Sequence, residues 1–162
     1  MSLMFLKLGD EIKGESTDSD HKEWIEVLSF SWSVNQPVSQ ASGTGGRTSS
    51  GVMFTDLTCM KTVDKSTADI MKFCAKGTHI PRVELEVVQD TGDKNTYLKY
   101  EMEDVVLSSV APSGDSGGGK PVEQLGMSFG KFKQTYTPTD HKGAPGTPMT
   151  RGWDLEINKE WQ

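Results

Sequence analysis

The sequence has little of what several classes of protein require. Its 162 residues include only two cysteines, Cys59 and Cys74, too few and too widely spaced for a disulfide framework or a Cys-x-x-Cys redox or zinc site. We expect both to be reduced and to pack as small apolar side chains. No apolar run approaches the roughly 20 residues that cross a bilayer. The N-terminal apolar cluster is interrupted by Lys7 and lacks a signal-peptide pattern. We therefore expect no membrane insertion, and we expect the protein to be synthesised in the cytoplasm.

Clustered positive charge is also missing. The formal net charge is −6, with 17 Lys and Arg residues against 23 Asp and Glu residues. Binding to nucleic acid requires a basic face, whereas the basic residues here are scattered along the chain. The three histidines, His21, His79 and His141, lack the spacing of metal ligands. We therefore expect no nucleic-acid partner, no metal and no cofactor.

What the sequence does contain is a repeated alternation of apolar and polar residues, the pattern of half-buried strands. It predicts strands over residues 3–8, 23–34, 52–60, 81–90, 96–110, 123–137 and 152–158. Turn-forming residues at 90–95 connect two of these strands as an antiparallel hairpin. Because 162 residues is about the length of one domain, we predict a single, mainly β domain over residues 1–162.

One segment breaks this period. Residues 66–69 read Ser-Thr-Ala-Asp, a Ser-x-x-Asp form of the capping box, and Gly77 supplies a C-terminal stop. The apolar residues between them at helical spacing are Ile70, Phe73 and Cys74. The sequence therefore predicts one short α-helix over about residues 67–76, with this apolar stripe covered by the sheets.

A glycine-rich segment, residues 112–121, contains two motifs that resemble catalytic or nucleotide-binding sites. Gly-Asp-Ser-Gly-Gly at 114–118 has the letters around a trypsin-like nucleophile, Ser116, but the chain is too short for the double barrel that carries such a serine. The same loop is one residue from a P-loop, yet it has Pro121 where a P-loop has the magnesium-binding Ser or Thr. A strand, not a helix, is predicted to follow. We expect no enzymatic activity.

Several segments match, in order, the sequence pattern of the Hcp (haemolysin co-regulated protein) family. The first two are Ile-Lys-Gly-Glu-Ser-x-Asp at 12–18, followed by His21, and Trp-Ile-Glu-Val-Leu-Ser-Phe-Ser-Trp at 24–32. The later ones are Asp-Lys-Ser-Thr at 64–67, Gly-Thr-His-Ile at 77–80, Tyr-Thr-Pro at 136–138 and Gly-Trp-Asp-Leu-Glu-Ile-Asn-Lys at 152–159. The sequence resembles the family over essentially its whole length.

The resemblance implies a compact barrel of two antiparallel sheets with one short flanking α-helix, similar to phage tail-tube proteins. It implies a homohexameric ring that stacks into the inner tube of a type VI secretion system. The implied partners are a VgrG-type spike protein, a contractile sheath and effector proteins, some held inside the ring. The tube protein itself would leave the bacterial cytoplasm without a signal peptide. Because family members with fused toxins carry a long C-terminal domain and this chain ends at Gln162, we expect any effector to be a separate protein.

Two candidate surfaces follow from the sequence. Trp24, Phe30 and Trp32 require burial, so the opposite face of strand 23–34 should present Ser29, Ser31 and Ser33. That face is either outer solvent or lumen, and the resemblance favours a lumen that contacts effectors. Segment 36–51 has almost no apolar side chains and should become ordered only against a partner. Its candidate ring-stacking residues are Gln40, Ser42, Gly45, Arg47 and Ser49.

Other functions remain open from the sequence alone. A monomeric carbohydrate- or ligand-binding β-sandwich would have an aromatic-lined cleft, and a hydrolase would lose turnover on mutation of Ser116. A phage-type tail tube protein would share the fold. A closed ring with the mass of about six subunits would favour a tube protein over a monomeric binding domain.

Overall fold

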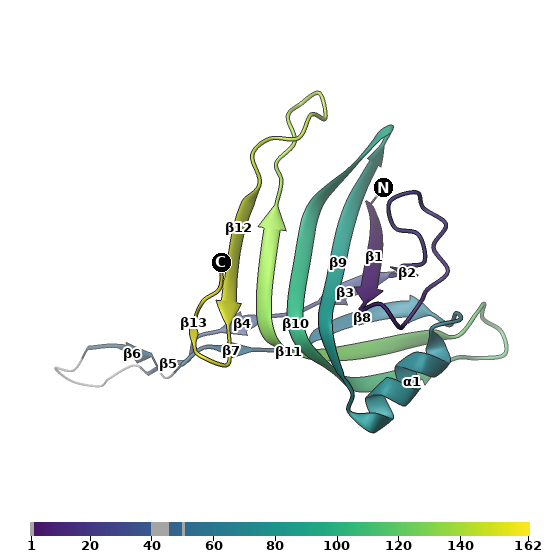
Figure 1. The fold of residues 1–162 in the computed structure, drawn as a ribbon, viewed down its shortest axis with the longest axis horizontal. Helices are drawn as coiled ribbons and strands as arrows, with labels where there is room; N and C mark the ends of the chain where they lie inside the picture. The colour runs from purple at the N-terminus through teal and green to yellow at the C-terminus, as the bar shows by residue number, and fades with distance from the viewer. Residues whose placement is uncertain (1, 40–45, 50) are drawn as a thin grey trace.

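A computed structural model describes residues 2–39, 46–49 and 51–162. Strands dominate, and a single helix occurs in the described part of the chain (Figure 1). In chain order the elements are β1 (Ser2–Leu8), β2 (Ile25–Glu26), β3 (Ser29–Ser31), β4 (Val34–Asn35), β5 (Val38–Ser39), β6 (Thr48–Ser49), β7 (Met53–Phe54), β8 (Leu57–Thr62), α1 (Thr67–Lys76), β9 (His79–Thr91), β10 (Asp93–Ser113), β11 (Val122–Tyr136), β12 (Met149–Asp154) and β13 (Lys159–Glu160). The helix is too short to cross a membrane, and the described residues include no other.

Nine strands form one antiparallel sheet that folds into two layers. The main layer has the order β13-β12-β11-β10-β9-β1-β2, and β3 and β8 join it through β11. The N-terminal part of β11 pairs with β8 and its C-terminal part pairs with β12, so β11 belongs to both layers. Figure 1 shows the long strands β10 and β11 turning from the upright layer into the layer at its foot.

The bend in β10 has local causes. Asp104 adopts a φ of 51°, and the register with β11 shifts between Leu107 and Ser109. Such irregularities increase twist and let one strand serve two layers. The predicted class, mainly β with one helix, is confirmed. The strand order ends at β13 on one side and at β2 on the other within the described residues, so the two layers do not close on each other there.

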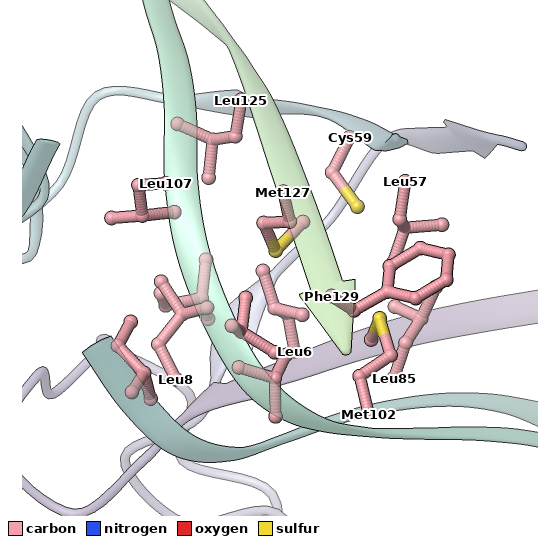
Figure 2. Close-up of a cluster of buried hydrophobic side chains, with 14 of the residues drawn as sticks. Leu6, Leu8, Leu57, Cys59, Leu85, Met102, Leu107, Leu125, Met127 and Phe129 are labelled. Carbon is pink, nitrogen blue, oxygen red and sulfur yellow. The ribbon is translucent and has the colours of Figure 1, made fainter. Parts of the chain in front are cut away.

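The space between the layers is filled by an aliphatic core and an adjoining aromatic cluster. Figure 2 shows side chains from β1, β8, β9, β10 and β11 converging in the aliphatic core, including Leu6, Leu57, Leu85, Met102, Leu125 and Met127. The aromatic cluster consists of Phe30, Trp32, Phe54, Tyr100, Phe129 and Phe132, with ring centroids 4.6–6.4 Å apart. Burial of these rings and aliphatic side chains is the main stabilising contribution to the fold.

Cys59 belongs to this core and Cys74 is half-buried on α1, and both are free thiols, as predicted. Burial raises the pKa of the Cys59 thiol to about 12. A thiol that resists ionisation is a poor nucleophile and a poor metal ligand. Cys59 is therefore a packing residue.

The predicted helix is confirmed, and its C-terminal stop is the expected one. Gly77 adopts the left-handed conformation with a φ of 64° and donates to the Cys74 carbonyl, while the Thr78 amide reaches the Phe73 carbonyl. The predicted capping box is wrong. Ser66 has helical backbone angles and forms no side-chain cap, because its hydroxyl donates to Asp64 instead.

The apolar stripe of α1 packs on the core as predicted, but unevenly. Ile70 is fully buried, whereas Phe73 and Cys74 are partly buried. We expect Phe73→Ala to lower the free energy of unfolding by about 2 kcal/mol, less than the 3–5 kcal/mol typical of a fully buried ring. Denaturant midpoints would measure the loss. Met71→Ala, at a position 59% exposed on the same helix, should change stability by less than about 0.5 kcal/mol. Equal losses from the two variants would contradict this packing.

The prediction of one continuous strand over 23–34 is wrong. The chain there forms β2, β3 and β4, and the side chains that point inward change at Leu28. Ile25 and Val27 are buried on the β2 side, whereas Phe30 points inward from β3. The change occurs because the chain leaves β1 and joins β8: the Val27 amide donates to Met4, and the Leu28 amide to Met60.

Candidate functional site

The free edges of the main layer are the first candidate surface. At one end, β2 pairs with only two residues of β1, Phe5 and Leu6. At the other end, β13 pairs with only Trp153 and Asp154 of β12. Beyond these pairs, β1 receives the Val27 amide at Met4 and bridges Ile12 at Leu8, and β12 receives the Trp161 amide at Gly152. The remaining residues of each outer strand have no neighbouring strand on that side within the described residues. Unpaired strand edges present rows of N–H and C=O groups that can pair with another chain.

A projecting hairpin is the second candidate surface. β4 pairs with β7 and β5 with β6, and Figure 1 shows these strands reaching away from the two layers. We call residues 34–54 the arm. Its exposed apolar side chains are Val34 (49% exposed), Val38 (51%) and Met53 (62%). Apolar groups held away from a core gain stability only by contact with something else.

The predicted ring-stacking residues lie on the arm, where the structure describes them. Arg47 is exposed, and Ser49 lies in β6, where it pairs with Val38. Gln40, Ser42 and Gly45 lie outside the described residues. The self-pairing of β5 with β6 was not predicted, because few apolar residues mark these short strands.

The three predicted lumen serines do not form one uniform row. Ser29 and Ser31 are exposed on β3, on the side opposite Phe30. Ser33 lies beyond β3, and its hydroxyl donates to Thr55 Oγ1 over 3.1 Å. The local alternation that separated serines from aromatic residues is therefore correct for β3, and Ser33 instead anchors the base of the arm.

A buried polar cluster lies near the β1 edge and was missed by the sequence analysis. His21 is 4% exposed, with Nδ1 3.0 Å from Asp18 and Nε2 2.7 Å from Glu86 of β9. Its ring stacks on Phe5 with centroids 4.3 Å apart. Lys94 of β10 donates to Asp18. These contacts fasten the long loop before β2 onto the sheet.

This cluster makes stability depend on acid pH. The Lys94 ammonium and then the His21 ring hold the pKa of the Asp18 carboxyl well below its usual range. A lowered folded-state pKa adds stability that is complete above the unfolded value, near 4, and is lost as pH falls further. We expect Asp18→Asn to flatten the acid limb of the unfolding free energy by up to about 1.4 kcal/mol per pH unit. Denaturant titrations between pH 2 and pH 5 would measure this, and parallel curves for parent and variant would contradict it.

A second buried polar cluster joins β8, β11 and the start of α1. Lys61 is fully buried, with Nζ 2.6 Å from Glu123 and 3.0 Å from Asp64. Thr67, the first residue of α1, donates its hydroxyl to Glu123 over 3.2 Å. The cluster therefore fixes the position of the helix against the second layer. No local sequence pattern marks it, since Lys61 and Glu123 are 62 residues apart.

The charged residues on one face of β9 and β10 form ion pairs with one another. Arg82 donates to Glu84 and Glu101, and Lys99 lies 3.1 Å from Glu84. Burial alone would raise the pKa of Glu84, but Lys99 and Arg82 outweigh it and lower that pKa. Because these charges are neutralised by neighbours on the same face, they add little electrostatic attraction for a binding partner.

The loop with protease-like and P-loop-like letters has neither context. Ser116 is exposed in the connection between β10 and β11. The loop leads into strand β11 at Val122, as predicted, whereas phosphate binding by a P-loop uses a helix N-terminus.

Comparisons with known proteins agree with one another. The model of the family described as "Type VI secretion system effector, Hcp" matches residues 5–136. Protein hcp1 of Pseudomonas aeruginosa is 36% identical over 157 residues, which cover 96% of each chain. A solved structure of a type six secretion system protein superposes with a TM-score of 0.94 at 32% identity, covering 99% of this chain and 100% of that one. Hcp1 from Salmonella typhimurium gives a TM-score of 0.81 at 34% identity, with 99% of each chain covered.

The family model covers residues 5–136, and the curated relative and the two solved structures match 96–99% of this chain. The chain belongs to the Hcp family of type VI secretion proteins.

Proposed function

We propose that this chain is an inner-tube subunit of a type VI secretion system, folded as one domain over residues 1–162. It forms hexameric rings that stack into a tube, is itself secreted, and carries effector proteins in the lumen. Its partners are further copies of itself, a VgrG-type spike, a contractile sheath and the effectors. The observation that carries the proposal is the pair of free edges at opposite ends of one sheet, in a member of the Hcp family.

Free edges at opposite ends favour a head-to-tail contact. If the β12 edge of one copy meets the β1 edge of the next, the same contact repeats around a ring. When the ring closes, every edge has a partner and none is left unpaired. Helix α1 lies at the foot of the layers, away from β12 and β13, and its Phe73 borders the residues that end β1 (Figure 1). Ring contacts are therefore built from strand edges and adjoining loops.

The arm is suited to contact between rings. It reaches beyond the body of the subunit, and its exposed Val38 and Met53 gain burial only against another copy. We assign ring stacking to this arm, with Gln40, Ser42, Gly45, Arg47 and Ser49 as its contact residues.

Ser29 and Ser31 are the proposed effector-contacting residues of the lumen, with Ser33 supporting them through Thr55. Small hydroxyls neither repel a partner by charge nor require one particular shape. They therefore suit contact with more than one effector.

The oligomeric state of the purified full chain tests the ring. Size-exclusion chromatography with light scattering should give about six subunits in mass, and electron microscopy should show closed rings. Export is tested separately by detecting the protein in medium from cells with and without a working contractile sheath. A protein that stays monomeric at high micromolar concentration would instead favour a ligand-binding β-sandwich.

Ser31→Gln tests the lumen assignment. Because Ser31 is exposed on β3, we expect the longer side chain to leave ring assembly intact, yet to crowd the wall and reduce effector recovery by about tenfold. The measurement is pull-down of a cognate effector by assembled rings. Ser116→Gln, at an exposed serine in the loop before β11, is the matched control and should recover as much effector as the parent. If Ser31→Gln rings recovered as much effector as parent rings, β3 would not be part of the surface that contacts effectors. If the variant formed no rings, Ser31 would instead lie in a contact between subunits.

A further inference from the structure

An apolar pocket opens beside β12, at the end of the aromatic cluster. It has a volume of about 160 Å³, and its lining consists of the mostly apolar set Trp32, Val34, Phe54, Phe132 and Trp153 together with Gln134, Arg151 and Gly152. Val34 is 49% exposed although it borders this cluster. A cavity of roughly 150 Å³ with apolar walls can hold a benzene ring. This pocket therefore has room for one branched aliphatic side chain.

One residue of the pocket wall, Trp153, carries a polar group that lacks a partner. The indole Nε1 of Trp153 is buried and has no hydrogen-bond partner in the part of the chain that the structure describes. Buried donors are nearly always paired, because an unmade hydrogen bond costs about 1–3 kcal/mol. A carbonyl oxygen brought within hydrogen-bond distance of Nε1 would satisfy this donor.

The apolar face continues along the same edge beyond the pocket. Arg151 and Met149 share the face of β12 that carries Trp153, because residues two apart on a strand point the same way. Met149 is 63% exposed, and Tyr136, its partner on β11, is 50% exposed. The second layer, with β3 and β8, does not extend over these residues, which leaves the inner face of β11 and β12 uncovered.

A matching projection lies at the opposite edge. Leu28 is 59% exposed, although its amide is fixed by a 2.7 Å hydrogen bond to the Met60 carbonyl. Its backbone is thus held in place before any partner arrives, which lowers the entropy lost on binding. Two residues earlier, Glu26 is exposed on β2, beside β1.

The two edges match in charge. Glu26 and Leu28 are two residues apart in the sequence, as are Arg151 and Trp153 of β12. Glu26 and Arg151 form no ion pair within the described residues, and the Arg151 guanidinium donates only to the adjacent Thr150 carbonyl, over 2.7 Å. An acidic and an apolar residue at one edge therefore face a basic residue and an apolar pocket at the other.

We propose that, in the ring, Leu28 of one copy inserts into the pocket beside Trp153 of the next copy while Glu26 pairs with Arg151. The pocket is complete only when the second copy supplies Leu28, and a backbone carbonyl near Leu28 accepts the Trp153 indole N–H. This inference rests on the proposed ring and assigns the residues of its subunit contact.

Charge reversal across the contact is the main test, with the full chain and light scattering as the readout. Glu26→Arg and Arg151→Glu should each weaken ring formation at least tenfold, because each places like charges opposite one another. The double variant Glu26→Arg with Arg151→Glu restores the pairing and should return assembly to within about threefold of the parent. Failure of the double variant to recover, with both single variants impaired, would overturn the pairing.

Two further variants separate the pocket from the fold. Leu28→Asp should prevent ring formation, because the pocket would have to bury a charge. Met71→Asp, at a helix position with the same 59% exposure, is its control and should assemble like the parent. Trp153→Phe removes the indole N–H together with part of the ring, so each contact should weaken by at least about 2- to 12-fold, and the thermal midpoint of the monomer measures any cost to the fold itself.

The outcomes distinguish this inference from the proposed function. A parent chain that never forms rings overturns both. A parent that forms rings while Leu28→Asp and Trp153→Phe assemble equally well overturns the pocket contact and leaves the tube function standing. Rings lost from Met71→Asp but retained by Leu28→Asp would place the contact on the helix.

Discussion

Lys61→Met should lower the free energy of unfolding by about 3–5 kcal/mol, a large part of the 5–15 kcal/mol typical of a folded domain. Lys61 is fully buried, and Glu123, whose carboxylate lies 2.6 Å from its ammonium, is 1% exposed. Removing the ammonium leaves the Glu123 charge buried with only the Thr67 hydroxyl to stabilise it. The loss is therefore the cost of an unpaired buried charge, which far exceeds the value of a surface ion pair.

Two matched variants show whether burial is the cause. Lys65→Met removes an exposed lysine four residues away and should change stability by less than about 0.5 kcal/mol. Lys61→Met combined with Glu123→Leu removes the buried Glu123 charge as well and should recover much of the loss, while Asp64, which loses its ammonium in both variants, keeps its hydrogen bonds from Ser66. Urea midpoints at neutral pH would measure all three. A cost below about 1 kcal/mol for Lys61→Met would mean that water reaches Glu123 in the folded protein.

The features that were predicted correctly from the sequence are local ones. Helix α1 ends at Gly77 because the adjacent residues dictate the left-handed cap, and the hairpin of β9 and β10 follows from turn residues around Gly92. The Lys61 and His21 clusters could not be predicted from the sequence, because their contacts join residues that are far apart in the chain. Lys61 meets Glu123 across 62 residues, and His21 meets Glu86 across 65, so both contacts depend on strand register. Register was not specified by any motif.

The candidate site shows the same division. Alternation on β3 correctly placed Ser29 and Ser31 opposite Phe30, because the period of a strand is a local property. It failed at Ser33, since extending one strand through residues 23–34 ignored the step from β1 to β8 at Leu28. One strand through residues 23–34 would also put Leu28 on the face of Trp24, Phe30 and Trp32, whereas Leu28 is 59% exposed. The exposure of Leu28, on which the proposed ring contact depends, was therefore not predicted, because the chain passes from one layer to the other at this residue.

Removal of the arm should abolish ring stacking while leaving the subunit fold intact. Asn35 and Met53 are paired across β4 and β7, so residues 36–52 can be replaced by Asn-Gly, the two-residue turn that suits a hairpin. Trp32 and Phe54, which pack on the core at the base of the arm, are retained. Because the removed part lies away from the two layers, we expect the free energy of unfolding to change by less than about 1 kcal/mol.

Stacking should respond far more strongly than stability. Each stacked pair of rings in the proposed tube uses six arms, so losing even about 0.5 kcal/mol of contact per arm weakens stacking by more than a hundredfold. Electron microscopy of parent and variant at equal concentration would count stacked and single rings. A control with residues 40–45 replaced by glycine and serine keeps the strands β5 and β6, and so separates the effect of removing those strands from the chemistry of residues 40–45. Tubes that persist without the arm would transfer stacking to the faces of the body, whereas loss of single rings as well would show that the arm lies in the contact between neighbouring subunits rather than between rings.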